Sequence, residues 1–98
     1  MLDEIKKMQG INHNEFDSTI NNLIDSAKED LKSIGIVDTL IEKEETLIRT
    51  AIITYVLSFM DVNYSGLYTN SYQSQKDALR HYSEYLPNTE SGEESDGI

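Results

Sequence analysis

A stretch in the middle of the chain constrains the fold most, because as a helix it would be apolar on nearly every side. It runs from Leu47 to Met60, reads LIRTAIITYVLSFM, and contains a single charged residue, Arg49. It falls short of the roughly 20 apolar residues that a bilayer-spanning helix needs, and Asp61 and Asn63 follow it at once. We therefore expect a long, soluble central helix from about Glu44 to about Asn63 that other protein surrounds on all sides.

Three more helices are expected, and since no strand-type alternation is sustained, the fold class is all-α, a small bundle of about four helices. The first covers 2–8 and ends at Gly10, and the second covers 16–34 and ends at Gly35. The last runs from Tyr72 to about Leu86, where Pro87 stops it. The second helix has the clearest apolar stripe, formed by Phe16, Ile20, Leu23, Ile24, Ala27, Leu31 and Ile34.

Capping residues and a short connecting piece complete the expected helical domain. We expect Asn14 or Asp17 to cap the second helix and Asn70 or Ser71 to cap the last one. Between the second and central helices, Asp38 and Thr39 resemble caps, and Leu40 and Ile41 should pack onto the core. On the second helix, we expect solvent to face Asn22, Asp25, Lys28, Glu29 and Lys32.

The domain organisation follows from where apolar residues stop. Residues 1–87 form the helical domain, and residues 88–98 form an acidic C-terminal tail with four acids and no base. A segment of this composition buries too little apolar surface to offset the entropy lost on ordering, so alone it should be disordered.

The tyrosine-rich segment YSGLYTNSYQS, which begins at Tyr64, is expected to be a loop and a candidate contact surface. Tyrosine combines apolar area with a polar tip and is favoured at interfaces. The candidate subunit-interface residues are Tyr64, Leu67, Tyr68 and Tyr72. Two explanations stay open for the cover of the central helix: the first helix together with Leu40 and Ile41, or a neighbouring subunit. Tyr55, Tyr72 and Tyr82 could equally belong to the core or its rim.

Charge and residue usage exclude several classes of function. The chain has 18 acidic and 8 basic residues, a net charge of −10, which argues against a free-standing nucleic-acid binder. With no cysteine it has no disulfide and no thiolate metal site. The N-terminus has no signal-peptide pattern. His13, Glu15 and Asp17 alternate, but a polar capping loop explains them better than a metal site. No phosphate-binding loop, nucleophile elbow or zinc motif occurs, so we expect no enzyme, no metal and no cofactor.

The pattern of helix faces resembles the small head–tail connector, or adaptor, proteins of tailed bacteriophages. The matching segments are FDSTINNLIDSAKEDLKSIGI, LIRTAIITYVLSFM and, after the tyrosine-rich segment, SYQSQKDALRHYSEYL. The resemblance implies a structural neck protein that forms a homo-oligomeric ring, usually a dodecamer, beneath the portal protein. The ring would extend the DNA channel and join the head to a stopper or head-closure protein.

The resemblance also implies which residues meet which partner. The C-terminal helix and tail of such proteins tend to engage the portal, so the candidate portal-binding residues are Tyr82, Tyr85, Leu86 and Pro87. DNA would pass through the acidic lumen without specific binding. The protein would be found in the virion neck, and in the host cytoplasm before assembly.

Two other functions remain open. One is a small helical regulator that binds a protein through the tyrosine-rich segment. The other is a DNA-mimic inhibitor whose acids imitate phosphates. The mimic is weakened because Lys28, Lys32 and Lys43 are interleaved with the acids.

Overall fold

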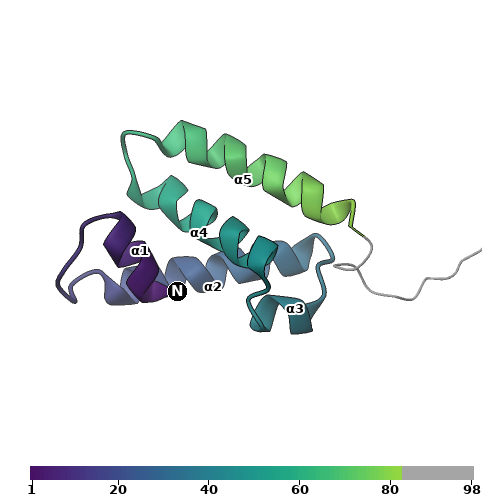
Figure 1. Cartoon of the computed structure of the whole chain (residues 1–98), viewed down its shortest axis with the longest axis horizontal. Helices are drawn as coiled ribbons and strands as arrows, with labels where there is room; N and C mark the ends of the chain where they lie inside the picture. Colours follow the sequence, from purple (N-terminus) through teal and green to yellow (C-terminus); the bar gives the residue numbers. More distant parts are fainter. Residues whose placement is uncertain (83–98) are drawn as a thin grey trace, which may run out of the picture.

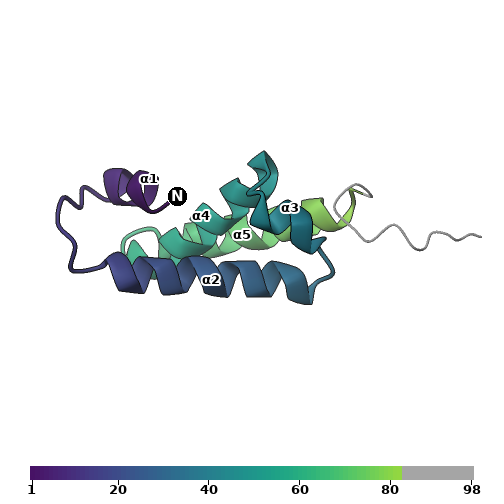
Figure 2. The same cartoon turned by 90° about the horizontal axis from the view of Figure 1, so that it is seen from below.

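The helices α2, α4 and α5 form the body of the subunit, with α4 between the other two (Figure 1). This computed structural model describes residues 1–82, and within them it contains five helices and no strand, which confirms the all-α class. Their bounds are α1 Leu2–Met8, α2 Asp17–Ser33, α3 Asp38–Glu42, α4 Thr46–Met60 and α5 Ser65–Arg80. The helix α1 lies over the end of α4 near the α1–α2 loop, and α3 closes the opposite end (Figure 2). Pro87 and the boundary between domain and tail lie outside the described residues.

The bounds of α2 were predicted correctly to within one residue at each end. Ile20, Ile24, Ala27 and Leu31 are buried in the core that α2 shares with α4 and α5. Phe16 departs from the prediction, since it precedes the helix and its side chain is 46% exposed. The predicted caps were also wrong: the N-terminal flanking residues of α2, α3 and α5 make no capping hydrogen bond through their side chains.

Three helices end in the same backbone motif, in which one residue adopts the left-handed conformation and turns the chain. At the end of α2, Gly35 has φ +95°, its N–H bonds the Lys32 carbonyl, and the Ile36 N–H bonds the Leu31 carbonyl. The end of α1 repeats this pattern around Gly10, with φ +67°. At the end of α3 the left-handed residue is Glu44, with φ +54°, a conformation that is strained for a residue with a side chain.

The central helix is shorter than predicted. It begins at Thr46 because Glu44 has already ended α3, and the Glu45 carboxylate then accepts the Leu47 N–H at 2.9 Å. It ends at Met60, and the carboxylate of the next residue, Asp61, accepts the N–H groups of Asn63 and Tyr64. With 15 residues, α4 is shorter than α2, which has 17, and α5, which has 16. The expected long central helix is therefore not observed.

The cover of α4 comes largely from its own chain. Ile48, Ala51, Ile52 and Val56 are fully buried, and fully buried Ile5 of α1 and Ile41 of α3 join the same core. Two of its apolar residues remain outside this cover, since Leu47 is 46% and Phe59 62% exposed.

The tyrosine-rich loop was the clearest error of the sequence analysis. Residues 65–80 are one helix, and the true turn is only Asp61 to Tyr64. The Ser65 hydroxyl donates to the Ser58 carbonyl at 2.7 Å, which fixes the start of α5 against α4. Asn70 and Ser71, predicted as caps, therefore lie inside the helix. Gly, Ser and Asn suggested a loop, whereas Tyr68, Tyr72 and Leu79 share one helical face that packs inward.

Candidate functional site

The consecutive helices α4 and α5 form a helical hairpin. A groove runs between them on the side of this hairpin that faces α1. Residues at alternating spacings of three and four line it on each helix, so both present one stripe to the same groove. Its larger part has a volume of about 520 Å³ and is lined by Met8, Gln9, Thr50, Ile53, Thr54, Leu57, Asp61, Tyr64 and Tyr68. Its smaller part, about 110 Å³, is lined by Leu47, Thr50, Gln75, Ala78, Leu79 and Tyr82. Thr50 lines both parts and so marks the middle of the groove.

The groove is nearly neutral, and the polar groups of its larger part near α4 bond within the chain, whereas the buried Gln75 Oε1 of its smaller part accepts no hydrogen bond among the described residues. The hydroxyl groups of Thr50 and Thr54 donate to backbone carbonyls one turn earlier, at 3.0 and 2.9 Å. Asp61 is the one charged residue of the lining. Its carboxylate accepts the Gln9 side-chain amide at 3.4 Å. The lining therefore favours apolar contact over recognition of a charged ligand.

The opposite side of the hairpin carries an exposed aromatic side chain, Phe59. Its ring lies 5.0 Å from the Tyr55 ring, centroid to centroid, one helical turn away. Beside it is a shallow hollow of about 230 Å³ between α2 and α5, lined by Asp30, Tyr55, Ser58, Phe59, Thr69, Tyr72, Gln73 and Lys76. The hairpin thus has a groove on one side and a projecting ring on the other.

A polar cluster in this hollow fastens α5 to α2. The Tyr72 hydroxyl donates to the Asp30 carboxylate at 2.6 Å, and Lys76 Nζ lies 3.0 Å from the same oxygen. Lys76 Nζ also lies 5.0 Å from the centre of the Tyr72 ring, within the range of a cation–π contact. We call Asp30, Tyr72 and Lys76 the clamp.

The contacts within the clamp change the pKa values of Asp30 and Tyr72. Burial alone would raise the pKa of Asp30, but the hydrogen bonds from Tyr72 and Lys76 and the Lys76 charge hold that pKa below its ordinary value. Burial, followed by the hydrogen bond to Asp30, raises the pKa of Tyr72 well above its ordinary value. The clamp is therefore most favourable when Asp30 is ionised and Tyr72 is protonated.

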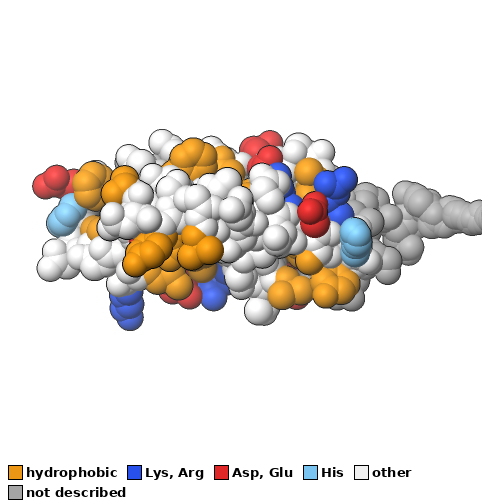
Figure 3. All heavy atoms as spheres, turned by 90° about the horizontal axis from the view of Figure 1, so that it is seen from above, with side chains coloured by type: hydrophobic (Ala, Val, Ile, Leu, Met, Phe, Trp, Pro, Cys, Tyr) orange, Lys and Arg blue, Asp and Glu red, His pale blue; other side chains and the backbone are white. Residues whose placement is uncertain are grey.

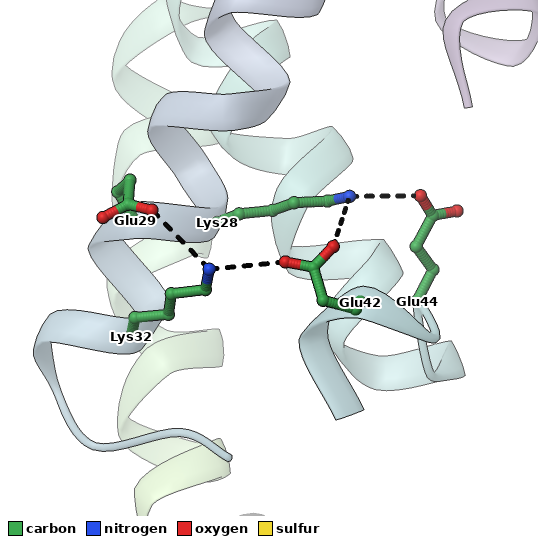
Figure 4. Close-up of polar contacts among 5 residues, drawn as sticks. All are labelled: Lys28, Glu29, Lys32, Glu42 and Glu44. Atoms are coloured by element: carbon green, nitrogen blue, oxygen red, sulfur yellow. Dashed lines mark hydrogen bonds and ion pairs between the residues drawn. The ribbon is translucent and has the colours of Figure 1, made fainter. Parts of the chain in front are cut away.

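A second charged cluster joins α3 to α2 and corrects another prediction. Lys28 and Lys32 were expected to face solvent, but their side chains are only 16% and 30% exposed. Figure 4 shows both reaching from α2 toward Glu42 and Glu44 at the end of α3. Lys28 lies 3.4 Å from Glu44, and Lys32 lies 3.3 Å from Glu42 and 3.6 Å from Glu29. The hydrogen bond that the Lys32 ammonium group donates to the Glu42 carboxylate raises the pKa of Lys32.

Exposed apolar side chains gather near the α4–α5 turn. Among residues 1–82, six of the eight large exposed ones belong to α1, the α1–α2 loop, the end of α4, the turn and the start of α5: Met8, Phe16, Phe59, Val62, Tyr64 and Leu67. Residues 62–75 contain no charged side chain. Figure 3 shows that the middle of the α5 face is uncharged and that hydrophobic patches lie on both sides of it.

The predicted interface residues lie in different settings on this surface. Tyr64 is 58% and Leu67 62% exposed near the turn, and half-buried Tyr68 lines the groove. Tyr72 is 4% exposed and belongs to the core, as one of the open alternatives held. Sequence reasoning missed Thr50, Ile53 and Phe59.

The predicted portal-binding residues are only partly described. Tyr82, 47% exposed, lines the far end of the groove. Tyr85, Leu86 and Pro87 lie outside the described residues.

Residues 1–82 contain no group of three or more His, Cys, Asp or Glu side chains placed to hold a metal ion. No helix among them is long and apolar enough to cross a membrane. The His13 ring nitrogen Nδ1 accepts the Glu15 backbone N–H at 3.3 Å, which fits a role in the loop before α2.

Comparison with known protein families gives a match over most of the chain. A family model described as phage connector protein matches residues 1–86, a range that includes all five helices. Neither the curated proteins nor the solved structures give a match.

Proposed function

We propose that this chain, which belongs to the phage connector protein family, is a ring-forming neck subunit. Members of this family are structural components of phage particles. The ring, a dodecamer by the family resemblance, sits beneath the portal protein and joins the head to a stopper or head-closure protein. The observation that carries the proposal is the family match, which spans residues 1–86 and leaves out Pro87 and the acidic tail, residues 88–98. Proteins of such structural families are not normally enzymes, and we propose no catalytic role.

The subunit contacts of the ring use the neutral face around the α4–α5 turn. Tyr64, Leu67 and Tyr68 supply exposed or half-exposed aromatic and apolar area there. Tyrosine with Ser, Asn and Gly is a composition that binds proteins well, because the aromatic ring loses little entropy on contact. Tyr72 contributes indirectly, since its hydrogen bond to Asp30 fixes α5 on α2.

The portal contact uses the C-terminal end of the subunit. Tyr82 is the last described residue, and the predicted partners Tyr85, Leu86 and Pro87 follow it directly. The acids of residues 88–98 supply charge that basic residues of a portal could pair with. The stopper would bind the opposite side of the ring.

The acidic composition suits a channel through which DNA slides. A net charge of −10 per subunit repels phosphates, so DNA crosses the lumen without specific binding. The subunit waits in the host cytoplasm before assembly and ends in the virion neck.

The DNA-mimic alternative finds less support in the charge arrangement. A mimic needs unpaired carboxylates on one face, whereas Glu29, Glu42 and Glu44 already pair with lysines of α2. Paired acids are a poor imitation of a phosphate row.

The experiment that tests the proposal compares phage particles made with and without this protein. Without it, DNA-filled heads should accumulate that carry portals but no tails. Purified protein added to portals should give a complex whose mass in native mass spectrometry corresponds to a ring of copies. Normal tailed particles in its absence, or no complex with portals, would overturn the proposal.

A further inference from the structure

We propose that the α4–α5 groove of one subunit receives the Phe59 side chain of a neighbouring copy. The inference rests on the proposed ring function and adds to it the two surfaces that meet.

The groove has the size and chemistry to receive an aromatic side chain. Its larger part, about 520 Å³, lies in the range of protein cavities that enclose small organic molecules. Met8, Ile53 and Leu57 form apolar parts of its wall, and Tyr64 and Tyr68 border it. Its threonine hydroxyls and the Asp61 carboxylate are engaged within the chain. A guest therefore leaves none of these groups newly unpaired when water is displaced.

Phe59 has the properties of a side chain that inserts into such a groove. It is 62% exposed although it is large and apolar. The Tyr55 ring, 5.0 Å away, supports it from one side, which lowers the entropy lost when a partner encloses it. Full burial of an aromatic ring removes a large apolar area from water.

The two features face opposite ways on one helix. Thr50, at the middle of the groove, and Phe59 are nine residues apart, which is about two and a half turns of an α-helix. Their side chains therefore point to opposite sides of α4. A contact between two different surfaces of identical chains is heterologous, and its repetition closes into a ring when the rotation between subunits allows.

Charge favours a second copy over other occupants. Two copies that each carry −10 repel one another unless the contact is neutral, and the groove has one charged residue that is already bonded. A basic partner would gain nothing from a neutral groove. The chain's own acidic tail would find no cation among the groove's lining residues.

Cysteine cross-linking can test the contact cleanly, because the chain has no native cysteine. The full-length variants Thr50→Cys and Phe59→Cys are treated with a short bismaleimide, separately and mixed, both at high protein concentration and in assembled particles. We expect no product from either variant alone, a covalent dimer from the mixture, and a ladder of multimers from the double variant. Both positions are exposed, so the fold should be retained.

The matched control replaces Phe59→Cys with Asn21→Cys, at an exposed position on a different helix, α2. Absence of the 50–59 product from both samples overturns the inference, as does an equal yield with the control or self-linking of a single variant. Particles that contain the protein without this product would leave the proposed neck function standing. Particles that lack the protein altogether would remove that function as well.

Discussion

At the scale of single residues, the clamp shows how a partly buried charge is used in a small helical subunit. Asp30 lies on α2, and its two partners lie on α5, more than 40 positions along the chain. Tyr72 brings apolar area to the core and a hydroxyl to its edge, so one side chain contributes both packing and polar specificity. The position of α5 on α2, and with it one wall of the groove, depends on this contact.

A double-mutant cycle on the clamp should reveal its coupling. Tyr72→Phe removes only the hydroxyl, and Asp30→Asn removes the charge at nearly constant shape. Each should lower the free energy of unfolding by about 1 kcal/mol, and the pair should show a coupling of about 0.5–1 kcal/mol because Asp30 is partly exposed. Urea unfolding of the four proteins measures this. Additive losses would mean that the hydrogen bond contributes nothing specific.

The same residues predict how stability depends on pH. Because the pKa of folded Asp30 lies below its ordinary 3.8, the clamp is at full strength above that value and is lost as the pH falls through the folded pKa. For Tyr72 the folded pKa is raised, so its contribution is present below its ordinary 10.0 and is lost as the pH rises beyond that. In acid titrations of stability, Asp30→Asn should lose less than the wild type. Parallel curves would exclude Asp30 as a source of the acid sensitivity.

At the scale of elements, the helix ends determine the topology. The left-handed residues Gly10, Gly35 and Glu44 end the first three helices, so α1, α2 and α3 turn by one motif. At the third end a side chain occupies the strained conformation, and that side chain reaches Lys28 of α2. The ion pair offers one physical reason why glutamate is accommodated where glycine would fit the backbone more easily.

Two glycine substitutions should change stability in opposite directions. Gly35→Ala forces a side chain into φ +95° and should lower the free energy of unfolding by about 1–2 kcal/mol. Gly66→Ala lies within α5 with open space around the new methyl group, and it should raise stability by about 0.5 kcal/mol. Thermal unfolding followed by circular dichroism compares them. A stabilising Gly35→Ala would contradict the motif assigned to the end of α2.

A helix could be predicted from the sequence where the spacing of its apolar residues was regular. It was missed where its Gly, Asn and Ser content suggested a loop instead. The stripe from Ile20 to Leu31 is strictly periodic, and α2 was predicted almost to the residue. In α5 the same spacing joins Tyr68, Tyr72 and Leu79, but Gly66, Asn70 and Ser71 suggested a loop. Tertiary packing on α4 overrides the weak helix propensity of those residues.

The candidate site was predictable only in part for the same reason. Tyr64, Leu67 and Tyr68 stood out through tyrosine density and neutral composition. Thr50, Ile53 and Phe59 did not, because the groove exists only once α5 is known to begin at Ser65 and to pair with α4. The lysines of α2 were expected to be solvated, since sequence alone did not place α3 beside them.

At the scale of the whole molecule, neutral apolar surface and charge occupy different regions. Within the part of the chain that the structure describes, the α4–α5 turn region carries most of the large exposed apolar side chains, and residues 62–75 are uncharged. The ion-paired acids Glu42 and Glu44 lie at the end of α3, away from that turn (Figure 1). This separation lets one acidic subunit offer both a neutral contact face and a charged one.

The net charge predicts that the isolated protein does not bind duplex DNA. Eight basic residues among 98 provide no adequate footprint against the phosphate backbone, and several of them are already ion-paired. Fluorescence anisotropy of labelled duplex at physiological salt should stay unchanged, with a basic DNA-binding protein as positive control. Tight binding with a steep salt dependence would contradict the proposed channel role.

The tail should matter for attachment but not for folding. In the described part, the buried apolar residues lie between Ile5 and Leu79, so deletion of Pro87 to Ile98 should leave the thermal midpoint nearly unchanged. Attachment to portals should weaken, and attachment of the full chain should fall as salt rises, because part of it is charge pairing.

A tail of unchanged length with Glu90, Glu93, Glu94 and Asp96 replaced by their amides separates the effect of charge from that of length. Pull-down on immobilised portals at increasing salt compares the three proteins. Equal binding of all three would limit the acids to solubility.

The apolar side chains around the α4–α5 turn also have a thermal consequence. Contacts that bury such groups have a negative change in heat capacity, and their strength fades on cooling. Attachment through ion pairs does not share this dependence. A neck whose subunits meet through Phe59 and the groove therefore loses cohesion between its copies when chilled, while its hold on a charged partner persists.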